Sequence, residues 1–234
     1  MTETTLKRYA IIVAGGSGTR MNTPVPKQFL KLEGKPVLMH TINKFLETNL
    51  HIEIILVLPA AQISYWQQLC AEYHFTTKLT LAESGETRFH SVKNGLAFIK
   101  ENGIVAIHDA VRPLVSIKTI ATAYKAAEMY GNAVPAIPLN DSIRQIDSTL
   151  SIAVDRTKYC IIQTPQCFNT GIIKNAYRQD YKYTFTDDAT VVECAGEKIH
   201  LIDGNSDNIK ITTPQDLVVA EALLKSKTVS APIK

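Results

Sequence analysis

Residues 9–18 of the chain, YAIIVAGGSG, begin as an apolar run with β-branched side chains and contain three glycines near their end. Such a run favours a buried β-strand, and glycines directly after it favour a tight loop whose backbone can approach a ligand closely. In sheets of parallel strands, ligands bind beyond the carboxyl ends of the strands. The stretch therefore predicts the first strand of an α/β fold with a binding loop at one edge of its sheet.

The rest of the chain alternates short apolar runs with helical patterns. Further strands are predicted at 52–59, 78–84, 103–110, 132–138 and 197–204. Apolar residues at helical spacing predict helices at 38–49, 61–74, 86–102 and 117–131. Alternation of this kind is typical of βαβ units. We expect a Rossmann-like α/β fold, a mostly parallel sheet flanked by helices, in a single domain that spans residues 1–234.

The alternation breaks between residues 139 and 158. Two segments with period-two patterns, 142–147 and 151–156, flank the turn-forming STL at 148–150. Because these segments offer little apolar material to the main core, we expect residues 139–158 to project as a β-hairpin arm. A last helix is predicted at 213–226, with Thr213 and Pro214 as its N-cap and first residue.

Composition narrows the class of partner. The 234 residues are 45% hydrophobic and 20% charged, with a net charge of +3. This mild basic excess suits small anions, whereas the dense Lys/Arg stripe of a nucleic-acid surface is missing. No apolar run is long enough for a signal sequence or a membrane span, so we predict a cytoplasmic protein without a membrane partner. The four cysteines lack zinc or CxxC spacing and are predicted to be reduced thiols.

The glycine loop does not match the two commonest phosphate motifs. A P-loop requires GK[ST], which does not follow Gly18, and a dinucleotide fingerprint requires glycine in place of Met21. Backbone N–H groups of the loop can still face phosphate oxygens, with Arg20 and Lys27 supplying positive charge. Taken alone, these residues also allow a simple tight turn with two solvated cations.

A longer set of motifs resembles a known family. The stretch AGGSGTRM…PKQF, within 14–29, resembles the signature loop of nucleotidyltransferases that join a nucleoside triphosphate to a sugar or polyol phosphate. The segments SGETRFHSV, HDAVRP, VDRTKYCIIQTPQCF, FTDDAT and DNIKITTPQDL resemble, in the same order, motifs of the 2-C-methyl-D-erythritol 4-phosphate cytidylyltransferase family of the non-mevalonate isoprenoid pathway. The resemblance implies transfer of a cytidylyl group from CTP to the polyol phosphate, with release of pyrophosphate and with Mg²⁺ as cofactor.

The resemblance also implies roles for individual residues. Arg20, Lys27 and Lys210 correspond to cations that stabilise the reacting phosphates, as a reaction between anions requires. The implied nucleotide-binding residues are Ala14, Gly15, Gly16, Gly18, Gly85, Glu86 and Ser91, the last three facing the cytosine. Read without the resemblance, the segment around Gly85 is a helix start capped by Ser84 or Thr87, and Lys210 is a solvated cation. His90 is assigned no role.

Asp109 and Arg112 lie at the end of a predicted strand, where a ligand is expected. The carboxylate of Asp109 can hold Mg²⁺ directly or through water, because this ion keeps several waters and takes few protein ligands. Asp207 is a weaker metal candidate. Capping of the next helix, or a simple pair between Asp109 and Arg112, is the alternative. The resemblance makes both residues candidates for substrate binding.

The arm completes the implied site. In the family, this segment is exchanged across a homodimer and carries an arginine into the neighbouring active site, and the matching residue is Arg156. An arginine fork fits a phosphate dianion geometrically. Ser142 in the arm and Thr186 in FTDDAT match further substrate contacts. We therefore expect a homodimer held by the arm, with CTP and a polyol phosphate as its ligands.

Three alternatives stay open from the sequence. A ribitol-5-phosphate cytidylyltransferase has a similar glycine loop and HDAVRP segment, although ETRFHSV and VDRTKYCIIQTPQ favour the erythritol enzyme. A nucleotide-sugar glycosyltransferase would use Asp187 and Asp188 as a metal-binding pair, but this pair is predicted to open a helix. A non-catalytic nucleotide sensor would bind CTP without releasing pyrophosphate.

Overall fold

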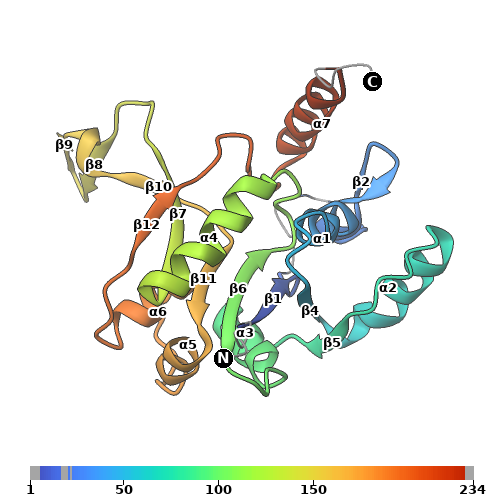
Figure 1. Cartoon of the computed structure of the whole chain (residues 1–234). Coiled ribbons are helices and arrows are strands. Elements are labelled where there is room, and N and C mark those ends of the chain that lie inside the picture. The colour runs from blue at the N-terminus through green and yellow to red at the C-terminus, as the bar shows by residue number, and fades with distance from the viewer. Residues whose placement is uncertain (1–5, 17–20, 22, 230–234) are drawn as a thin grey trace.

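The computed structural model describes residues 6–16, 21 and 23–229, and their strands form one large sheet and two small ones (Figure 1). The strands are β1 (Lys7–Val13), β2 (Lys31–Leu32), β3 (Lys35–Pro36), β4 (Ile52–Leu58), β5 (Thr80–Glu83), β6 (Gly103–Asp109), β7 (Asn132–Pro138), β8 (Arg144–Asp147), β9 (Leu150–Ala153), β10 (Cys160–Ile162), β11 (Gln166–Asn169) and β12 (Leu201–Asp203). The helices are α1 (Val37–Leu46), α2 (Ala60–Glu72), α3 (Arg88–Leu96), α4 (Ile117–Tyr130), α5 (Thr170–Ala176), α6 (Asp188–Glu193) and α7 (Pro214–Val229).

The large sheet confirms the predicted mostly parallel α/β fold. Its strand order is β10-β7-β11-β6-β1-β4-β5, and β12 pairs with β7. The central strand β1 runs parallel to both β4 and β6, so the carboxyl ends of these strands meet at one edge. β11 runs antiparallel between β6 and β7. Neither β11 nor β10 was predicted from the sequence, because the βαβ alternation gives no signal for an inserted antiparallel strand.

Helices cover both faces of the large sheet. Along β1, Ala10 and Ile12 pack into a core with α1, α2 and α4, whereas Tyr9 and Ile11 pack into a second core with α3, α5 and α6. This alternation is what a strand buried on both faces requires. Among the described residues, no helix is long and apolar enough to cross a membrane.

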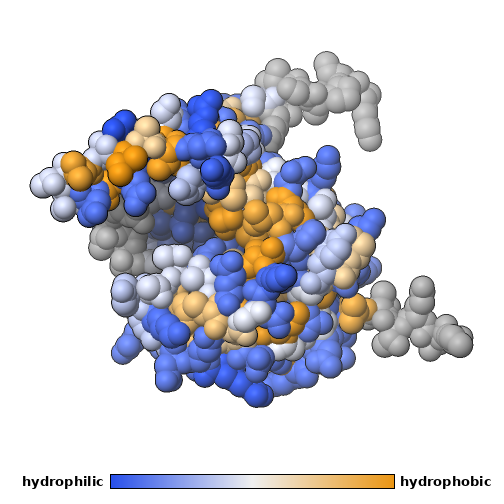
Figure 2. All heavy atoms as spheres, turned by 90° about the vertical axis from the view of Figure 1, so that its left-hand side faces the viewer, coloured by the Kyte–Doolittle hydropathy of each residue, from blue (hydrophilic) through white to orange (hydrophobic). Residues whose placement is uncertain are grey.

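The segment predicted as an arm contains an antiparallel hairpin. Arg144–Asp147 pairs with Leu150–Ala153, and every residue of both strands is exposed. The hairpin projects from the rest of the fold at the upper left of Figure 1. Figure 2 shows apolar side chains on this projecting segment. The exposed large apolar residues of the hairpin are Ile146, Leu150 and Ile152. Its role in dimerisation stays a prediction.

A buried histidine ties β6 to the loop before β11. The imidazole of His108 donates from Nε2 to the carbonyl of Arg112 at 3.1 Å, and its Nδ1 accepts from the hydroxyl of Thr164 at 3.0 Å. Both ring nitrogens are therefore used by the neutral form. Burial lowers the pKa of His108 from 6.5 to about 4.

This pKa predicts acid sensitivity of the fold. Between pH 6.5 and 4, the unfolded chain binds a proton at His108 that the native chain does not bind, so the free energy of unfolding falls as the pH is lowered through this window. The expected contribution is about 3 kcal/mol. Denaturant titrations at a series of pH values, in buffer without divalent cations, measure it.

The matched control is His108→Gln, which keeps a donor and an acceptor but does not titrate here. His40 is half-buried and its pKa is also lowered, chiefly by this partial burial, so the wild-type slope contains both residues. The difference between wild type and variant isolates His108. Parallel stability curves for the two proteins between pH 6.5 and 4 would contradict the assignment.

Candidate active site

Two clefts adjoin at the carboxyl edge of the sheet. The first cleft, of about 300 Å³, includes the described part of the glycine loop and the start of α3; its lining residues are Val13, Ala14, Gly15, Gly16, Lys27, Gln28, Glu86, Thr87, Arg88, Ser91, Asp109, Ala110, Val111 and Lys210. The second cleft, of about 560 Å³, is lined among others by Arg112, Gln163, Thr164 and Thr186. Arg88, Asp109 and Lys210 line both clefts and mark their border.

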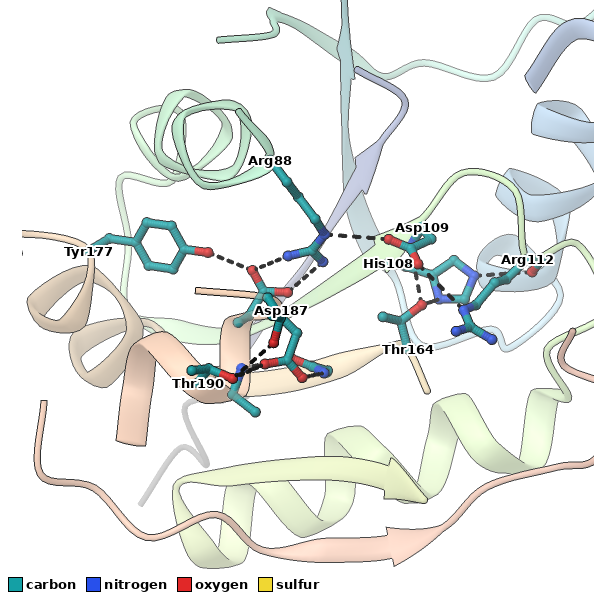
Figure 3. Close-up of polar contacts among 12 residues, drawn as sticks. Arg88, His108, Asp109, Arg112, Thr164, Tyr177, Asp187 and Thr190 are labelled. Atoms are coloured by element: carbon teal, nitrogen blue, oxygen red, sulfur yellow. Dashed lines mark hydrogen bonds and ion pairs between the residues drawn. The ribbon is translucent and has the colours of Figure 1, made fainter. Parts of the chain in front are cut away.

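The carboxylate of Asp109 forms ion pairs with three cations at this border. Its carboxylate lies 2.9 Å from Nζ of Lys210 and 3.5 Å from Nε of both Arg88 and Arg112. Figure 3 shows the two arginines reaching Asp109 from opposite sides. Burial opposes ionisation of Asp109, but the three positive charges outweigh it and hold the pKa of Asp109 well below 3.8. The carboxylate is therefore ionised at neutral pH.

The four charged groups come from three segments of the chain. Asp109 is the last residue of β6, Arg88 is the first residue of α3, and Arg112 lies in the turn after β6. Lys210 precedes α7, and its segment is held near the cluster because Arg112 donates to the carbonyl of Asn208 at 2.7 Å. Arg88 and Lys210 from distant segments, and Arg112 from the adjoining turn, thus share one buried carboxylate.

Arg88, which was not among the predicted site residues, has a second buried partner. It donates to both carboxylate oxygens of Asp188, at 2.9 and 2.7 Å, and Asp188 is fully buried. The hydroxyl of Tyr177 donates to the same carboxylate at 2.6 Å. Figure 3 shows Arg88 reaching from α3 to the acidic groups, with Tyr177 on the far side from Asp109. The pair fixes the guanidinium at the border of the clefts.

The carboxylates of Asp187 and Asp188 both make hydrogen bonds within the fold. Asp187 caps α6: its carboxylate accepts from the backbone N–H of Thr190 at 2.9 Å and from the Thr190 hydroxyl at 2.6 Å. Asp188 faces Arg88 and Tyr177. Asp187 lines the second cleft, whereas Asp188 is fully buried and lines neither cleft, so the two carboxylates do not face one cleft together as the metal-binding pair of a glycosyltransferase would.

Close packing excludes a side chain at Gly15, in the first cleft, and at Gly85, in the loop before α3. A β-carbon on Gly15 would lie 2.8 Å from Cβ of Ser84, and one on Gly85 would lie 2.4 Å from Cβ of His90. Ser91 accepts from the N–H of Gly85 at 3.1 Å and donates to the carbonyl of Thr87 at 2.9 Å. The loop before α3 therefore lies directly against the glycine loop.

Two further residues support the loops of this cleft. Thr87 is the N-cap of α3, one of the two caps that the sequence allowed. Gln28, buried and not predicted as a site residue, donates to the carbonyl of Ala14 at 3.0 Å and to Gln62 at 2.7 Å. The sequence signal that could have identified Gln28 is its position in the PKQF motif. Gln28 thereby holds the start of the glycine loop beside Lys27.

Not all of the other predicted site residues line the two clefts. Thr186 lines the second cleft, whereas Asp207 lines neither cleft. Ser142 and Arg156 are exposed on the arm, outside the clefts of their own chain, and Arg156 donates to the carbonyl of Asn140. Gly18 and Arg20 lie outside the described residues.

The described residues contain no group of three or more His, Cys, Asp or Glu side chains that could hold a metal ion. A Mg²⁺ ion does not need such a group when phosphates and waters supply most of its ligands. Asp109 offers one ionised carboxylate at the border of the two clefts. The donor set therefore fits a magnesium ion that arrives with a phosphorylated ligand, and it does not fit an ion held by protein alone.

Comparisons with known proteins agree with one another. Residues 9–226 match the family model described as "IspD: 2-C-methyl-D-erythritol 4-phosphate cytidylyltransferase". Proteins of that name from Bacteroides thetaiotaomicron and Phocaeicola vulgatus are 48% and 49% identical over 219 residues, which cover 94% of this chain and 100% of each relative. The crystal structure of 4-diphosphocytidyl-2C-methyl-D-erythritol synthase from Anaerococcus prevotii superposes with a TM-score of 0.80 at 28% identity, over 94% of this chain and 96% of that one. The chain belongs to the 2-C-methyl-D-erythritol 4-phosphate cytidylyltransferase family.

Proposed function

We propose that the protein joins CTP and 2-C-methyl-D-erythritol 4-phosphate to give 4-diphosphocytidyl-2-C-methyl-D-erythritol and pyrophosphate, in isoprenoid precursor biosynthesis. The observation that carries the proposal is the meeting of two clefts at Asp109, Arg88 and Lys210. One cleft suits a nucleotide and the other a second phosphorylated ligand. A cationic border between them is what a reaction between two phosphates requires. Family membership supports the same reaction.

In this reaction a phosphate oxygen of the polyol phosphate attacks the α-phosphorus of CTP, and the bond to pyrophosphate breaks. The triphosphate lies against the backbone of Gly15 and Gly16 and near Lys27, which line the first cleft. Gly85, Glu86 and Ser91 face the cytosine. Lys210 stands between the clefts and contacts both phosphates. Arg20 adds charge at the triphosphate in this proposal.

The second cleft receives the polyol phosphate. Arg112 and Thr186 line it and offer hydrogen-bond donors to a phosphate and its polyol chain. Val134, Ile162 and Ile199 line it as well. These apolar side chains favour a polyol that carries a methyl branch, a group that ribitol phosphate lacks. Ser142 and Arg156 complete the site from a neighbouring chain.

Magnesium is proposed as the cofactor. Asp109 would hold it, with Asp207 as the weaker candidate because it lies outside the two clefts. The bound ion would neutralise charge on the triphosphate. The residues of this chain then bind and orient the two ligands, and Arg88 and Lys210 remain at the border as fixed positive charges.

Substrate assays test the proposed function. Purified protein is incubated with CTP, Mg²⁺ and either methylerythritol phosphate or ribitol phosphate, and pyrophosphate is measured. We expect release foremost with methylerythritol phosphate. The Lys27→Ala variant tests the proposed role of the site. It should lower kcat by a large factor and weaken CTP binding less, because Lys27 acts on charge that grows in the transition state.

Equal or greater release with ribitol phosphate would assign the chain to the related reaction. Saturable CTP binding without pyrophosphate from either polyol would instead identify a sensor. A Lys27→Ala protein with normal kcat and only a raised KM for CTP would make Lys27 a ground-state anchor and contradict the mechanism.

The dimer is proposed from the exposed apolar arm. Ile146, Leu150 and Ile152 are 79%, 68% and 61% exposed, and a two-stranded hairpin is marginally stable alone. A twofold-related copy of the chain is the simplest partner for these side chains. Arg156, at the base of the hairpin and outside the clefts of its own chain, then lies where it serves the neighbouring site.

Mixing two inactive proteins tests this sharing. A dimer of one Arg156→Ala chain and one Lys27→Ala chain contains one site with both defects and one site with neither. Such mixed dimers should recover up to about half the activity of a wild-type dimer. Lys158→Ala is the matched control, because Lys158 is an exposed cation of the same turn and should behave as wild type. A mixture that stays inactive after verified subunit exchange, or a monomeric protein in sedimentation, would refute the shared site.

A further inference from the structure

Gln28 is a buried polar residue that lines the first cleft and has no part in the mechanism described above. It lies in the short 3₁₀ turn Lys27–Phe29 and is only 2% exposed. A carboxamide is costly to bury unless its polar atoms are hydrogen-bonded. Its Nε2 donates to the carbonyl of Ala14 at 3.0 Å and to Oε1 of Gln62 at 2.7 Å. The side chain is therefore bonded to two other segments at once.

Gln62 connects this contact to helix α2. It lies in the first turn of α2, is half-buried and lines neither catalytic cleft. A carboxamide nitrogen carries two protons, and at Gln28 they serve the two acceptors. Methionine has a similar length but no donor, and a glutamate carboxylate only accepts. The two contacts therefore depend on the amide of Gln28 and not merely on its volume.

The bond to Ala14 fixes the first peptide of the glycine loop. The N–H of Ala14 extends the pairing of β1 with β4, because it donates to the carbonyl of Val57 at 2.9 Å. The carbonyl of Ala14 and the N–H of Gly15 belong to one planar trans peptide and point in opposite directions. Within the described part of the chain, no backbone carbonyl accepts from the N–H of Gly15. Gln28 thus orients an N–H group that stays available to a ligand.

Apolar contacts hold the 3₁₀ turn independently of this amide. Phe29 packs edge-on against Tyr65 of α2, with ring centres 5.2 Å apart, and stacks on Trp66 at 6.4 Å. The N–H of Phe29 also donates to the carbonyl of Pro26 at 2.8 Å. Loss of the Gln28 amide should therefore disturb the alignment of the glycine loop with the turn more than it disturbs the fold.

We propose that Gln28 and Gln62 are a positioning pair for the transfer reaction, an inference that rests on the proposed function. Gln62 orients the carboxamide of Gln28, and Gln28 holds the Ala14 carbonyl. The N–H of Gly15 and the ammonium of Lys27, which line the same cleft, then address the same triphosphate. Neither glutamine has to touch the reacting atoms. Small misplacements of groups that act in the transition state lower the rate more than they lower affinity.

Kinetics of Gln28→Met, Gln62→Leu and the double variant test the pair. Gln28→Met should lower kcat by about tenfold to a hundredfold and change the KM for CTP by less than about threefold. Gln62→Leu should lower kcat by about threefold to tenfold. The double variant should be no slower than Gln28→Met alone, because Gln62 acts through Gln28. Gln68→Leu is the matched control and should behave as wild type, since Gln68 is an exposed glutamine of the same helix.

NMR spectra of glycine-labelled protein without substrates give a readout that does not need the reaction. The amide nitrogen of Gly15 shares a peptide with the Ala14 carbonyl, so its signal should shift in Gln28→Met and in Gln62→Leu. It should keep its place in Gln68→Leu. The signals of Gly131 and Gly196, outside the loop, should stay unchanged in all variants and verify folding. If Gln28→Met does not fold, Gln62→Leu carries the test, because Gln62 is only half-buried.

Additive losses of kcat in the double variant, or a Gln28→Met protein that is impaired only in the KM for CTP, would overturn the positioning pair. An unchanged Gly15 signal in both single variants would also overturn it. A wild-type protein that releases no pyrophosphate would refute the proposed function instead. In that case the Gly15 signal still decides whether the two glutamines place the loop.

Discussion

The buried carboxylate of Asp109 is the constraint around which the site is arranged. It pairs with Arg112 in the turn that follows it, and with Arg88 and Lys210 from segments farther away in the chain. Without this carboxylate, three cations at the border of two clefts would repel one another. With it, a cationic border persists before any ligand arrives, and phosphates meet charges that need little rearrangement. The chemistry proposed for the family fits this arrangement.

Neutral and charged buried groups keep Asp109 and its partners in place. The hydroxyl of Thr164 accepts from the N–H of Asp109 at 3.2 Å and is itself bonded to His108, so the end of β6 is fixed to the loop before β11. On the other side, Asp188 holds Arg88 with two hydrogen bonds. Asp188 lines neither cleft. The site thus depends on residues that a ligand does not touch.

The sequence predicted the parallel core because its signals are local. The run at 132–138 coincides with β7, and the glycine loop follows β1 as expected. β11 and the partnership of Arg88 with Asp188 escaped prediction, because they depend on segments that meet only after folding. Arg88 and Asp188 are 100 residues apart, and each looks like an ordinary charge at a helix start. The sequence signal that could have identified these two residues is that Arg88 lies in the SGETRFHSV motif and Asp188 in the FTDDAT motif. Asp207, the weaker metal candidate of the sequence analysis, lines neither cleft.

The most direct test of the central role of the buried charge network is kcat of the Asp188→Asn protein, measured at saturating substrates and expressed per folded molecule. The substitution changes a carboxylate that contacts Arg88 and Tyr177 and lines neither cleft. Of these two partners only Arg88 lines the clefts, so Arg88 is the direct link between Asp188 and the reaction. The account predicts that kcat falls by about tenfold to a hundredfold, with a smaller change in CTP affinity. A folded Asp188→Asn protein with wild-type kcat would show that the position of Arg88 does not matter for the reaction.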